Sequence, residues 1–439
     1  MENKAINVRR IALDLIGRCE SGGGYSNIVI DTAIKRHDLS PADRALLTAL
    51  FYGVIERQIT LDYIISKLST ITPSKIESST KNILRLGLYQ LGFMKKIPPH
   101  AAVNETVALA NKRSRAFVNA VLRRYIREGE KIEFPDENRS FAEFLSAKYS
   151  VGLPLCKRLL DSYGKDECKA LFEAFDTTPP LTLRTNTLKI STDELLSRLS
   201  ERFPDAKRAA LAKDGLILSS APASELPELS GGLCTVQDEA SQICAAVLDA
   251  RRGDTVIDAC ACPGSKSFGA AMTMENEGKI LAFDLHENKL SLVERGAERL
   301  GISIISTNAR DAREFDPALC GIADRIICDV PCSGFGVIAK KPELRYKDPA
   351  ESDALPDIQL DILKNVSKYL KSGGTLVYST CTILPEENEK NILRFLKHNE
   401  DFSLVPFKVG EISADGGMIT LLPHRHGTDG FFIAKLTRK

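Results

Sequence analysis

Hydrophobic positions recur at helical spacing through the first 130 residues of the chain. The first such run places five apolar side chains on one face of a helix, namely Val8, Ile11, Ala12, Leu15 and Ile16. Ser40 precedes Pro41, an order typical of a helix N-cap followed by the first helical position. Similar runs cover 60–69, 74–94, 100–111 and a stretch ending near 126. The pattern predicts an all-helical domain over 1–130, followed by a helical connector over 131–178.

The pattern changes after Pro179 and Pro180. Apolar and polar positions alternate over Leu181–Asn186, as in a half-buried strand. Helical spacing follows over Ser191–Leu199, and a second short strand is expected at Leu216–Leu218. These elements predict a small α+β (RRM-like) subdomain over 179–232.

Strands and helices then alternate over 233–439, which predicts a parallel sheet of the α/β class. The strands expected are Thr255–Asp258, Ile280–Asp284, Ile302–Ser306, Ile326–Asp329 and Leu376–Ser379. The helices expected are Glu239–Leu248, one beginning at Ser265, Glu287–Leu300, Gln359–Leu370 and Glu386–His398. Met418–Leu422 and Phe431–Leu436 resemble a closing antiparallel hairpin.

Composition narrows the class of protein. Hydrophobic residues make up 43% and charged residues 27% of the 439 positions, as in ordinary globular proteins. No apolar run approaches the roughly 20 residues of a membrane-spanning helix, and the start, Met1–Asn7, lacks the apolar core of a signal peptide. We therefore expect a cytoplasmic protein without a membrane segment.

The eleven cysteines are irregularly spaced, and we expect mostly free thiols in a reducing compartment. Cys260, Cys262, Cys328 and Cys332 are flanked by strands rather than arranged as the close pairs of zinc-binding loops. No metal site is expected.

Charge is unevenly distributed, although the net charge is only +1. Residues 1–130 hold 20 Lys and Arg against 12 Asp and Glu, a net of +8. A basic region of this kind favours a polyanionic partner, with Lys112, Arg113 and Arg115 as clustered candidates for the contact. A solvated helical surface is the alternative.

Acidic residues stand at or just after the ends of successive expected strands, at Asp258, Asp284, Asp311 and Asp329. The first strand runs into the Gly-containing turn Cys260–Lys266, which offers free N–H groups to a ligand. Neither G-x-G-x-x-G nor a P-loop occurs there, so NAD and ATP fit poorly. Asp284 is placed to accept from ribose hydroxyls, and Asp311 from an adenine amino group. Four acids in register favour an adenosyl-type cofactor, although each alone could be a helix N-cap.

Two cysteines follow neighbouring expected strands, Cys332 in Asp329–Cys332 and Cys381 in Ser379–Cys381. Ligands bind at the carboxyl ends of parallel strands, so these thiols are placed for chemistry. A thiolate that attacks carbon 6 of a pyrimidine makes carbon 5 able to accept a methyl group. An acid at Asp329 could stabilise that attack if it were protonated in an apolar site. Each cysteine singly could instead be a buried strand residue.

Several segments resemble the RNA cytosine-5 methyltransferases that use S-adenosylmethionine. They are Cys260–Lys266, Asp284, Asp329–Gly334, Tyr378–Glu389, Arg184–Lys189 and Asp429–Leu436. Residues 5–128 resemble a NusB-like RNA-binding domain, through Pro99–Glu105 and Phe117–Arg124. The combination resembles the bacterial RsmB (Sun/Fmu) type, which acts on 16S rRNA. This implies a Rossmann-like class I methyltransferase domain behind an all-α domain and a small α+β subdomain.

The resemblance also implies roles for individual residues. Cys381 would be the nucleophile, Cys332 would assist product release, and Asp329 would contact the cytosine. The S-adenosylmethionine pocket would be lined by Cys260, Ala261, Cys262, Pro263, Gly264, Ser265, Lys266, Asp284, Asp311 and Asp329. The expected partner is 16S rRNA and the expected state a monomer.

The chain departs from the family's usual residues at two positions. Ser265 stands where the family usually has glycine, and we expect it to cap the following helix; Phe335 replaces a small residue or Thr. The alternatives are the same chemistry on tRNA or another rRNA site, and a non-catalytic RNA-binding factor in ribosome assembly.

Overall fold

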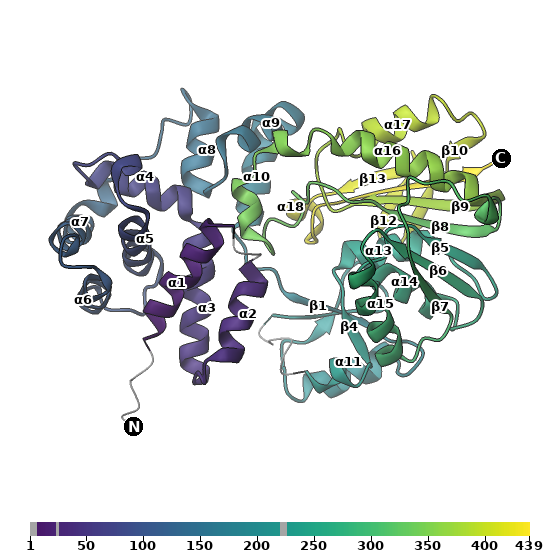
Figure 1. Ribbon diagram of the computed structural model, residues 1–439, viewed down its shortest axis with the longest axis horizontal. Coiled ribbons are helices and arrows are strands. Elements are labelled where there is room, and N and C mark those ends of the chain that lie inside the picture. The colour runs from purple at the N-terminus through teal and green to yellow at the C-terminus, as the bar shows by residue number, and fades with distance from the viewer. Residues whose placement is uncertain (1–6, 23–25, 220–225) are drawn as a thin grey trace. The chain divides into compact units, whose positions relative to one another are not determined.

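The computed structural model describes residues 7–22, 26–219 and 226–439. Residues 1–6, which make up most of the Met1–Asn7 stretch considered above, lie outside these ranges. The chain forms two compact units (Figure 1). The first unit comprises Met1–Asp176 with Lys340–Pro349, and the second comprises Thr177–Ala339 with Ala350–Lys439.

The first unit is helical over its described residues. Its helices are α1 (Val8–Glu20), α2 (Ser26–Arg36), α3 (Pro41–Glu56), α4 (Gln58–Leu68), α5 (Ser78–Phe93), α6 (Pro99–Leu109), α7 (Arg115–Glu128), α8 (Phe141–Tyr149), α9 (Leu153–Tyr163) and α10 (Lys165–Phe175). Ser40 caps α3 by accepting from the Asp43 N–H, as predicted. Leu50, Phe51 and Leu84 are fully buried in one apolar core, so this unit has a hydrophobic core of its own.

A short segment from far along the chain belongs to this helical unit. Lys340–Pro349 contains the 3-10 helix Pro342–Tyr346. The buried Arg345 guanidinium donates to Tyr149 O at 2.8 Å, to Phe175 O at 2.5 Å and to Asp176 Oδ1 at 3.1 Å. Because a buried guanidinium without acceptors is costly, these three bonds anchor the segment. Sequence analysis predicted nothing of this kind.

The second unit begins with a four-stranded antiparallel sheet in the order β2-β3-β1-β4. Its elements are β1 (Leu181–Thr185), α11 (Thr192–Ser200), β2 (Lys207–Arg208), β3 (Gly215–Leu218), α12 (Pro227–Ser230) and β4 (Cys234–Val236). The strands at β1 and β3 and the helix between them match the prediction. Strands β2 and β4 are too short to show an alternating pattern, and the sequence did not indicate them.

The larger sheet has eight strands among the described residues, in the order β10-β14-β9-β8-β5-β6-β7 with β13 paired to β14. They are β5 (Thr255–Asp258), β6 (Lys279–Asp284), β7 (Ile305–Ala309), β8 (Ala323–Asp329), β9 (Leu370–Thr380), β10 (Phe402–Leu404), β13 (Met418–Leu421) and β14 (Phe431–Arg438). The strands from β5 to β9 are parallel. Strands β10, β13 and β14 pair antiparallel, and β11 (Phe407–Val409) and β12 (Ile412–Ala414) form a separate hairpin. The predicted closing hairpin is β13–β14.

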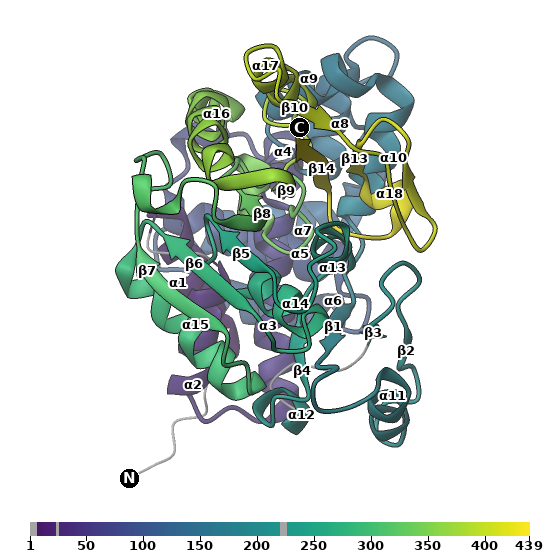
Figure 2. The same ribbon diagram turned by 90° about the vertical axis from the view of Figure 1, so that its right-hand side faces the viewer.

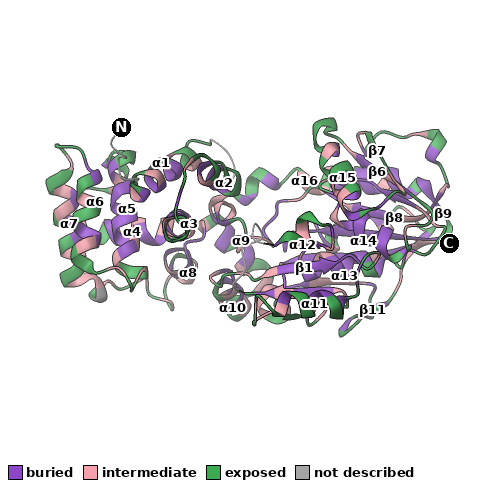
Figure 3. Cartoon of the chain, turned by 90° about the horizontal axis from the view of Figure 1, so that it is seen from below, coloured by how far each residue is buried: buried purple, intermediate pink, exposed green. Residues whose placement is uncertain are grey.

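Helices cover both faces of this sheet (Figure 2). One face carries α13 (Glu239–Val247), α14 (Ser265–Thr273) and α15 (Glu287–Leu300), and the other carries α16 (Leu355–Val366) and α17 (Glu389–Leu396); α18 (Pro423–His426) follows β13. Figure 3 shows burial following this arrangement, along the strands and the inner sides of the helices. The architecture confirms the predicted Rossmann-like domain behind an all-α region and a small α+β sheet.

Several predicted elements have other bounds. The helix expected at Glu386–His398 covers Glu389–Leu396, and the strand expected at Leu376–Ser379 covers Leu370–Thr380. The strand expected at Ile302–Ser306 begins only at Ile305, because Gly301, at φ 75°, ends α15 and the Ile302 N–H turns back to Ala297 O. Ile302 is therefore apolar as part of a helix C-cap. The helix expected to reach Leu370 ends at Val366, and Leu370 already begins β9. In the described part of the chain, no helix is long and apolar enough to cross a membrane.

Candidate active site

The strand order reverses between β5 and β8, and ligands of open α/β sheets bind beyond the carboxyl ends of the strands at such a point. Asp258 ends β5 and Asp329 ends β8. In the parallel register of β8 and β9, Asp329 pairs with Ser379. Side chains alternate along a strand, so these three residues lie on the same face as Val256, Ile327 and Val377, which pack against α13, α14 and α15.

The structure brings the two predicted cysteines together. Cys332 Sγ lies 3.3 Å from Cys381 Sγ, within hydrogen-bond distance for sulfur. The hydrogen bond to Cys381 and, to a lesser extent, burial raise the pKa of the Cys332 thiol well above its ordinary value. Either sulfur can be the donor of this hydrogen bond, so the two thiols act as one pair. No cysteine in the described parts of the chain forms a disulfide.

Asp329 is held by a cation and a hydroxyl. Lys266 Nζ donates to its Oδ2 at 2.6 Å, and Ser379 Oγ donates to its Oδ1 at 2.6 Å. The hypothesis of a protonated Asp329 in an apolar site does not match this arrangement, in which both oxygens accept. Burial alone would lower the pKa of Lys266, but Asp329, with smaller contributions from Cys244 and Cys381, outweighs burial and the pKa is raised. Lys266 also interacts electrostatically with Cys381, so positive charge stands beside both groups.

The turn Cys260–Lys266 requires glycine at one position. Gly264 has φ 106°, a conformation that other residues avoid, and a Cβ there would lie 2.5 Å from the Phe268 ring. Gly264 is also the N-cap residue of α14, with no side-chain cap. The expectation that Ser265 caps this helix was therefore wrong, because Ser265 is already its first helical residue.

Asp258 lies beneath this turn with an incomplete set of partners. Ser267 Oγ donates to its Oδ2 at 2.6 Å, while its Oδ1 has no hydrogen-bond partner among the described residues. Burial raises the pKa of the Asp258 carboxyl to about 7. The backbone N–H of Cys260 lies close enough to lower this pKa but makes no well-formed hydrogen bond to Oδ1. A buried carboxylate with spare acceptor capacity fits a cationic ligand group such as the ammonium of S-adenosylmethionine.

The remaining predicted pocket residues lie near the ends of β5, β6 and β7. Asp284 accepts from the Cys262 N–H at 3.2 Å and from the His286 N–H at 3.0 Å, which fixes its carboxylate at the strand end. Asp311 is paired with Arg313 at 2.6 Å, and this contact lowers the pKa of Asp311. Cys260 packs against the apolar cluster under α16, and burial raises the pKa of its thiol.

Sequence analysis missed two parts of this site. It assigned Lys266 to the cofactor turn and did not anticipate its ion pair with Asp329, and it assigned no role to Ser379. Strand alternation could have indicated Ser379, because it lies two residues before Cys381 and therefore on the same face. Among the residues with described positions, no group of three or more His, Cys, Asp or Glu side chains could hold a metal ion.

Comparisons with known proteins identify the family of this chain. The family model described as "16S rRNA methyltransferase RsmB/F" matches residues 245–437, the NusB family model matches 6–127, and the ferredoxin-like domain of RsmF/B-like methyltransferases matches 155–224. "Probable ribosomal RNA small subunit methyltransferase B" of Bacillus subtilis is 37% identical, with 99% of this chain and 100% of that protein covered.

Two further relatives extend the comparison. "Ribosomal RNA small subunit methyltransferase B" of Citrobacter koseri is 35% identical, again over 99% of this chain and all of that protein. A solved structure of a methyltransferase homolog protein from Pyrococcus horikoshii is 30% identical with a TM-score of 0.59, covering 67% of this chain and 98% of that one. The chain therefore belongs to the RsmB/F family of 16S rRNA methyltransferases.

Proposed function

We propose that this protein methylates carbon 5 of a specific cytosine in 16S rRNA, with S-adenosylmethionine as the methyl donor and a covalent bond between Cys381 and carbon 6 as the intermediate. The observation that carries this proposal is the pair of thiols 3.3 Å apart beside the Lys266–Asp329 ion pair. One sulfur can attack a pyrimidine while the second thiol lies beside it, and a cation and a carboxylate stand next to them.

The attack uses the charge of Lys266. The positive ammonium stabilises negative charge on Cys381 as its sulfur bonds to carbon 6. The Cys381 thiol proton passes to solvent. The electron pair of the carbon 5–carbon 6 double bond shifts within the ring to the carbon 4–carbon 5 bond, so negative charge builds up at N3. Lys266 donates toward Asp329, so a proton can pass from Lys266 through Asp329 to N3. The target base must leave its stack to reach these groups.

When bound, S-adenosylmethionine supplies an electrophilic methyl group. On this chain, Asp258 would hold its ammonium, Asp284 its ribose hydroxyls and Asp311 its adenine, beside the backbone of the Gly264 turn. After methylation the proton on carbon 5 must leave. Once its own proton has passed to solvent, Cys332 would accept this proton, directly or through water. The Cys381–carbon 6 bond then breaks with its electron pair returning to sulfur, and the N3 proton returns through Asp329 to Lys266.

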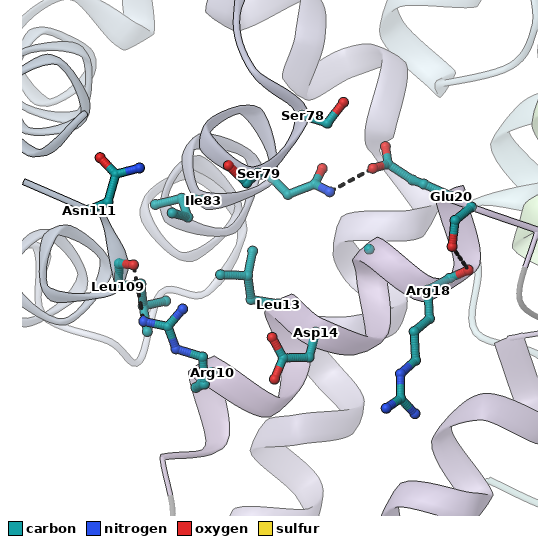
Figure 4. A pocket seen from close by; sticks show the side chains of 13 residues that line it. Arg10, Leu13, Asp14, Arg18, Glu20, Ser78, Ser79, Ile83, Leu109 and Asn111 are labelled. Atoms are coloured by element: carbon teal, nitrogen blue, oxygen red, sulfur yellow. Dashed lines mark hydrogen bonds between the residues drawn. The ribbon is translucent and has the colours of Figure 1, made fainter. Parts of the chain in front are cut away.

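The helical unit would hold the RNA. A hollow of about 790 Å³ on this unit is lined by Arg10 and Arg18 of α1, by Ser78 and Ser79 of α5, and by Asn111 (Figure 4). Asn111 directly precedes the exposed Lys112 and Arg113, and Arg10 donates to the backbone of Leu109. The basic side chains that line the hollow both come from α1 and stand beside Asp14 and Glu20 of the same helix. Lys112 and Arg113 follow Asn111 at its edge and would add phosphate contacts there.

The test of the catalytic assignment uses the two cysteines separately. Cys381→Ala is expected to abolish methyl transfer to unmodified 16S rRNA while calorimetry still detects cofactor binding. Cys332→Ala is expected to accumulate a protein–RNA adduct that survives denaturing electrophoresis. Full turnover by Cys381→Ala would refute the covalent mechanism.

Bisulfite sequencing of RNA from a deletion strain tests the substrate. Loss of one 5-methylcytosine in 16S rRNA is expected. Loss only in tRNA or in another rRNA would assign the chemistry to that substrate, and no loss together with no cofactor binding would indicate a non-catalytic assembly factor.

A further inference from the structure

A buried polar network lies behind the two cysteines and connects to neither the cofactor turn nor Lys266 by any described hydrogen bond. Its centre is the pair of consecutive residues Glu387 and Asn388, which precede α17. Glu387 is 1% exposed and Asn388 is fully buried. Their neighbours Gln359 and Thr380 are also fully buried. Polar side chains at such depth are costly unless they make specific hydrogen bonds.

Glu387 holds both sides of Cys332. Its Oε2 accepts from the backbone N–H of Ser333, the residue after the cysteine, at 2.9 Å. The same oxygen accepts from Gln359 Nε2 at 2.8 Å, and Gln359 Nε2 also donates to the carbonyl of Pro331, the residue before the cysteine, at 2.9 Å. One carboxylate oxygen therefore fixes the backbone on either side of this thiol.

Asn388 holds both sides of Cys381 in the same way. Its Oδ1 accepts from Thr380 Oγ1 at 2.6 Å, and its Nδ2 donates to the carbonyl of Thr382 at 3.0 Å. Thr380 and Thr382 are the two neighbours of the cysteine. The two halves meet at a hydrogen bond between Ser333 Oγ and Thr382 Oγ1 at 2.7 Å. Asn391 also links them, since it donates to Asn388 O and to Gln359 Oε1.

Both side chains leave a possible stabilising hydrogen bond unmade among the described residues. Asn388 occupies the N-cap position of α17, where an asparagine normally accepts from the first turn and stabilises the helix by about 1 kcal/mol. It makes no such bond to any described residue. Glu387 Oε1 is buried without a partner among the described residues. Both features cost stability, and departures of this kind concentrate at functional sites.

We propose that Glu387 and Asn388 are positioning residues with separate tasks, Glu387 orienting Cys332 for product release and Asn388 orienting Cys381 for attack. This inference rests on the proposed function and deepens it. The two residues act through the residues on either side of each thiol and through Gln359, without touching the thiols in any described hydrogen bond. A purely structural network would impair both steps together, whereas this one divides them between adjacent residues.

The test follows the covalent adduct with unmodified 16S rRNA and methyl-labelled cofactor. Glu387→Ala is expected to form the adduct but to resolve it about 100-fold more slowly, because misplacement of a reacting group by about 1 Å costs this much. Asn388→Ala is expected to form the adduct about 100-fold more slowly and to accumulate none. Cys332→Ala and Cys381→Ala are the reference variants for the two behaviours.

Isosteric variants separate hydrogen bonding from bulk. Glu387→Gln keeps an oxygen that can accept from Ser333 and Gln359, so it is expected to restore most of the adduct resolution lost in Glu387→Ala. Asn388→Asp keeps the acceptor for Thr380 but sets a carboxylate against the Thr382 carbonyl, so it is expected to resemble Asn388→Ala. Where an alanine variant does not fold, Gln359→Leu removes the hydrogen bonds of Gln359 to Glu387 and Pro331, and Thr380→Val removes the hydrogen bond of Thr380 to Asn388.

Equal loss of adduct in Glu387→Ala and Asn388→Ala would overturn the inference, as would a Glu387→Gln protein as slow as Glu387→Ala. These results leave the proposed function standing if Cys332→Ala still accumulates adduct. If Cys332→Ala accumulates none, the release role of Cys332 fails and the task of Glu387 fails with it. Cofactor binding by calorimetry should stay within about three-fold of the parent in every folded variant, since the network does not touch that turn.

Discussion

The buried carboxyl of Asp258 should make the second unit less stable as the pH rises. Asp258 is 1% exposed. Burial, with a smaller contribution from Asp329 and against the opposing effects of Ser267 and Lys266, raises the pKa of its carboxyl to about 7. In the unfolded chain an aspartate titrates near 3.9. Between these values the folded state binds a proton that the unfolded state has lost, so raising the pH across this window lowers the free energy of unfolding.

The size of the effect follows from the two pKa values. Each pH unit across the window corresponds to about 1.36 kcal/mol, so the roughly three units between them amount to about 4 kcal/mol, complete above about pH 7. Asp258→Asn cannot ionise and keeps an acceptor for Ser267 Oγ. The variant should therefore gain about 2 kcal/mol over the parent between pH 5.5 and 7.5, because about 1.5 units of the window are crossed there.

Amide hydrogen exchange of peptides from β5 and β8, measured at pH 5.5 and 7.5 and corrected for intrinsic rates, reports this free energy for the second unit alone. The parent should lose protection at the higher pH while Asp258→Asn does not. The variant should also bind S-adenosylmethionine about 10- to 100-fold more weakly, since a charge-assisted hydrogen bond is worth about 1.5–3 kcal/mol. Identical pH dependence in both proteins would refute the reasoning.

Three further changes probe other parts of the structure. Lys266→Met leaves Asp329 without its cation, which should lower the free energy of unfolding by about 2–3 kcal/mol. This is below the ~3–5 kcal/mol for a fully buried pair, because the Asp329 side chain is 29% exposed. An unchanged thermal midpoint would contradict this. Gly264→Ala should cost about 1–3 kcal/mol through backbone strain and weaken cofactor binding in calorimetry through the Phe268 contact, and undiminished affinity would argue against it. Arg345→Met should cost the first unit about 3 kcal/mol by leaving the Tyr149 and Phe175 carbonyls unpaired, while Asp176 keeps its ion pair with Arg57. Exchange in α8 and α10 measures this, and unaltered protection there would be the contrary result.

The alternation of strands and helices in the second unit could be predicted because each strand has a strong local pattern. The boundaries of β5 and α15 were predicted exactly, at Thr255–Asp258 and Glu287–Leu300. Two boundary errors, at Ile302 and at Leu370, have one cause. Ile302 and Leu370 are apolar for reasons of tertiary packing or helix capping, and local periodicity cannot distinguish these from strand or helix cores.

Long-range contacts were beyond sequence reasoning. The Lys340–Pro349 segment is placed by acceptors on α8 and α10, more than 160 residues away in the chain. The same holds for Lys266, whose partner Asp329 is 63 residues away. A short motif reveals which residue types chemistry needs, but it contains no information about which distant carboxylate will neutralise its lysine.

The separation of the two thiols depends on the register of β8 and β9. Asp329 pairs with Ser379, and their side chains share a face and a hydrogen bond. A slip of one residue would turn the Ser379 hydroxyl to the opposite face and move Cys381 along the strand by about 3.3 Å, out of contact with Cys332. The Ser379–Asp329 bond lies at the strand ends and the Glu387 and Asn388 bonds lie beyond them, so together they stabilise one register. The polar residues around the cysteines are therefore as necessary to the chemistry as the sulfur atoms, because without them the strands could pair without the thiols meeting.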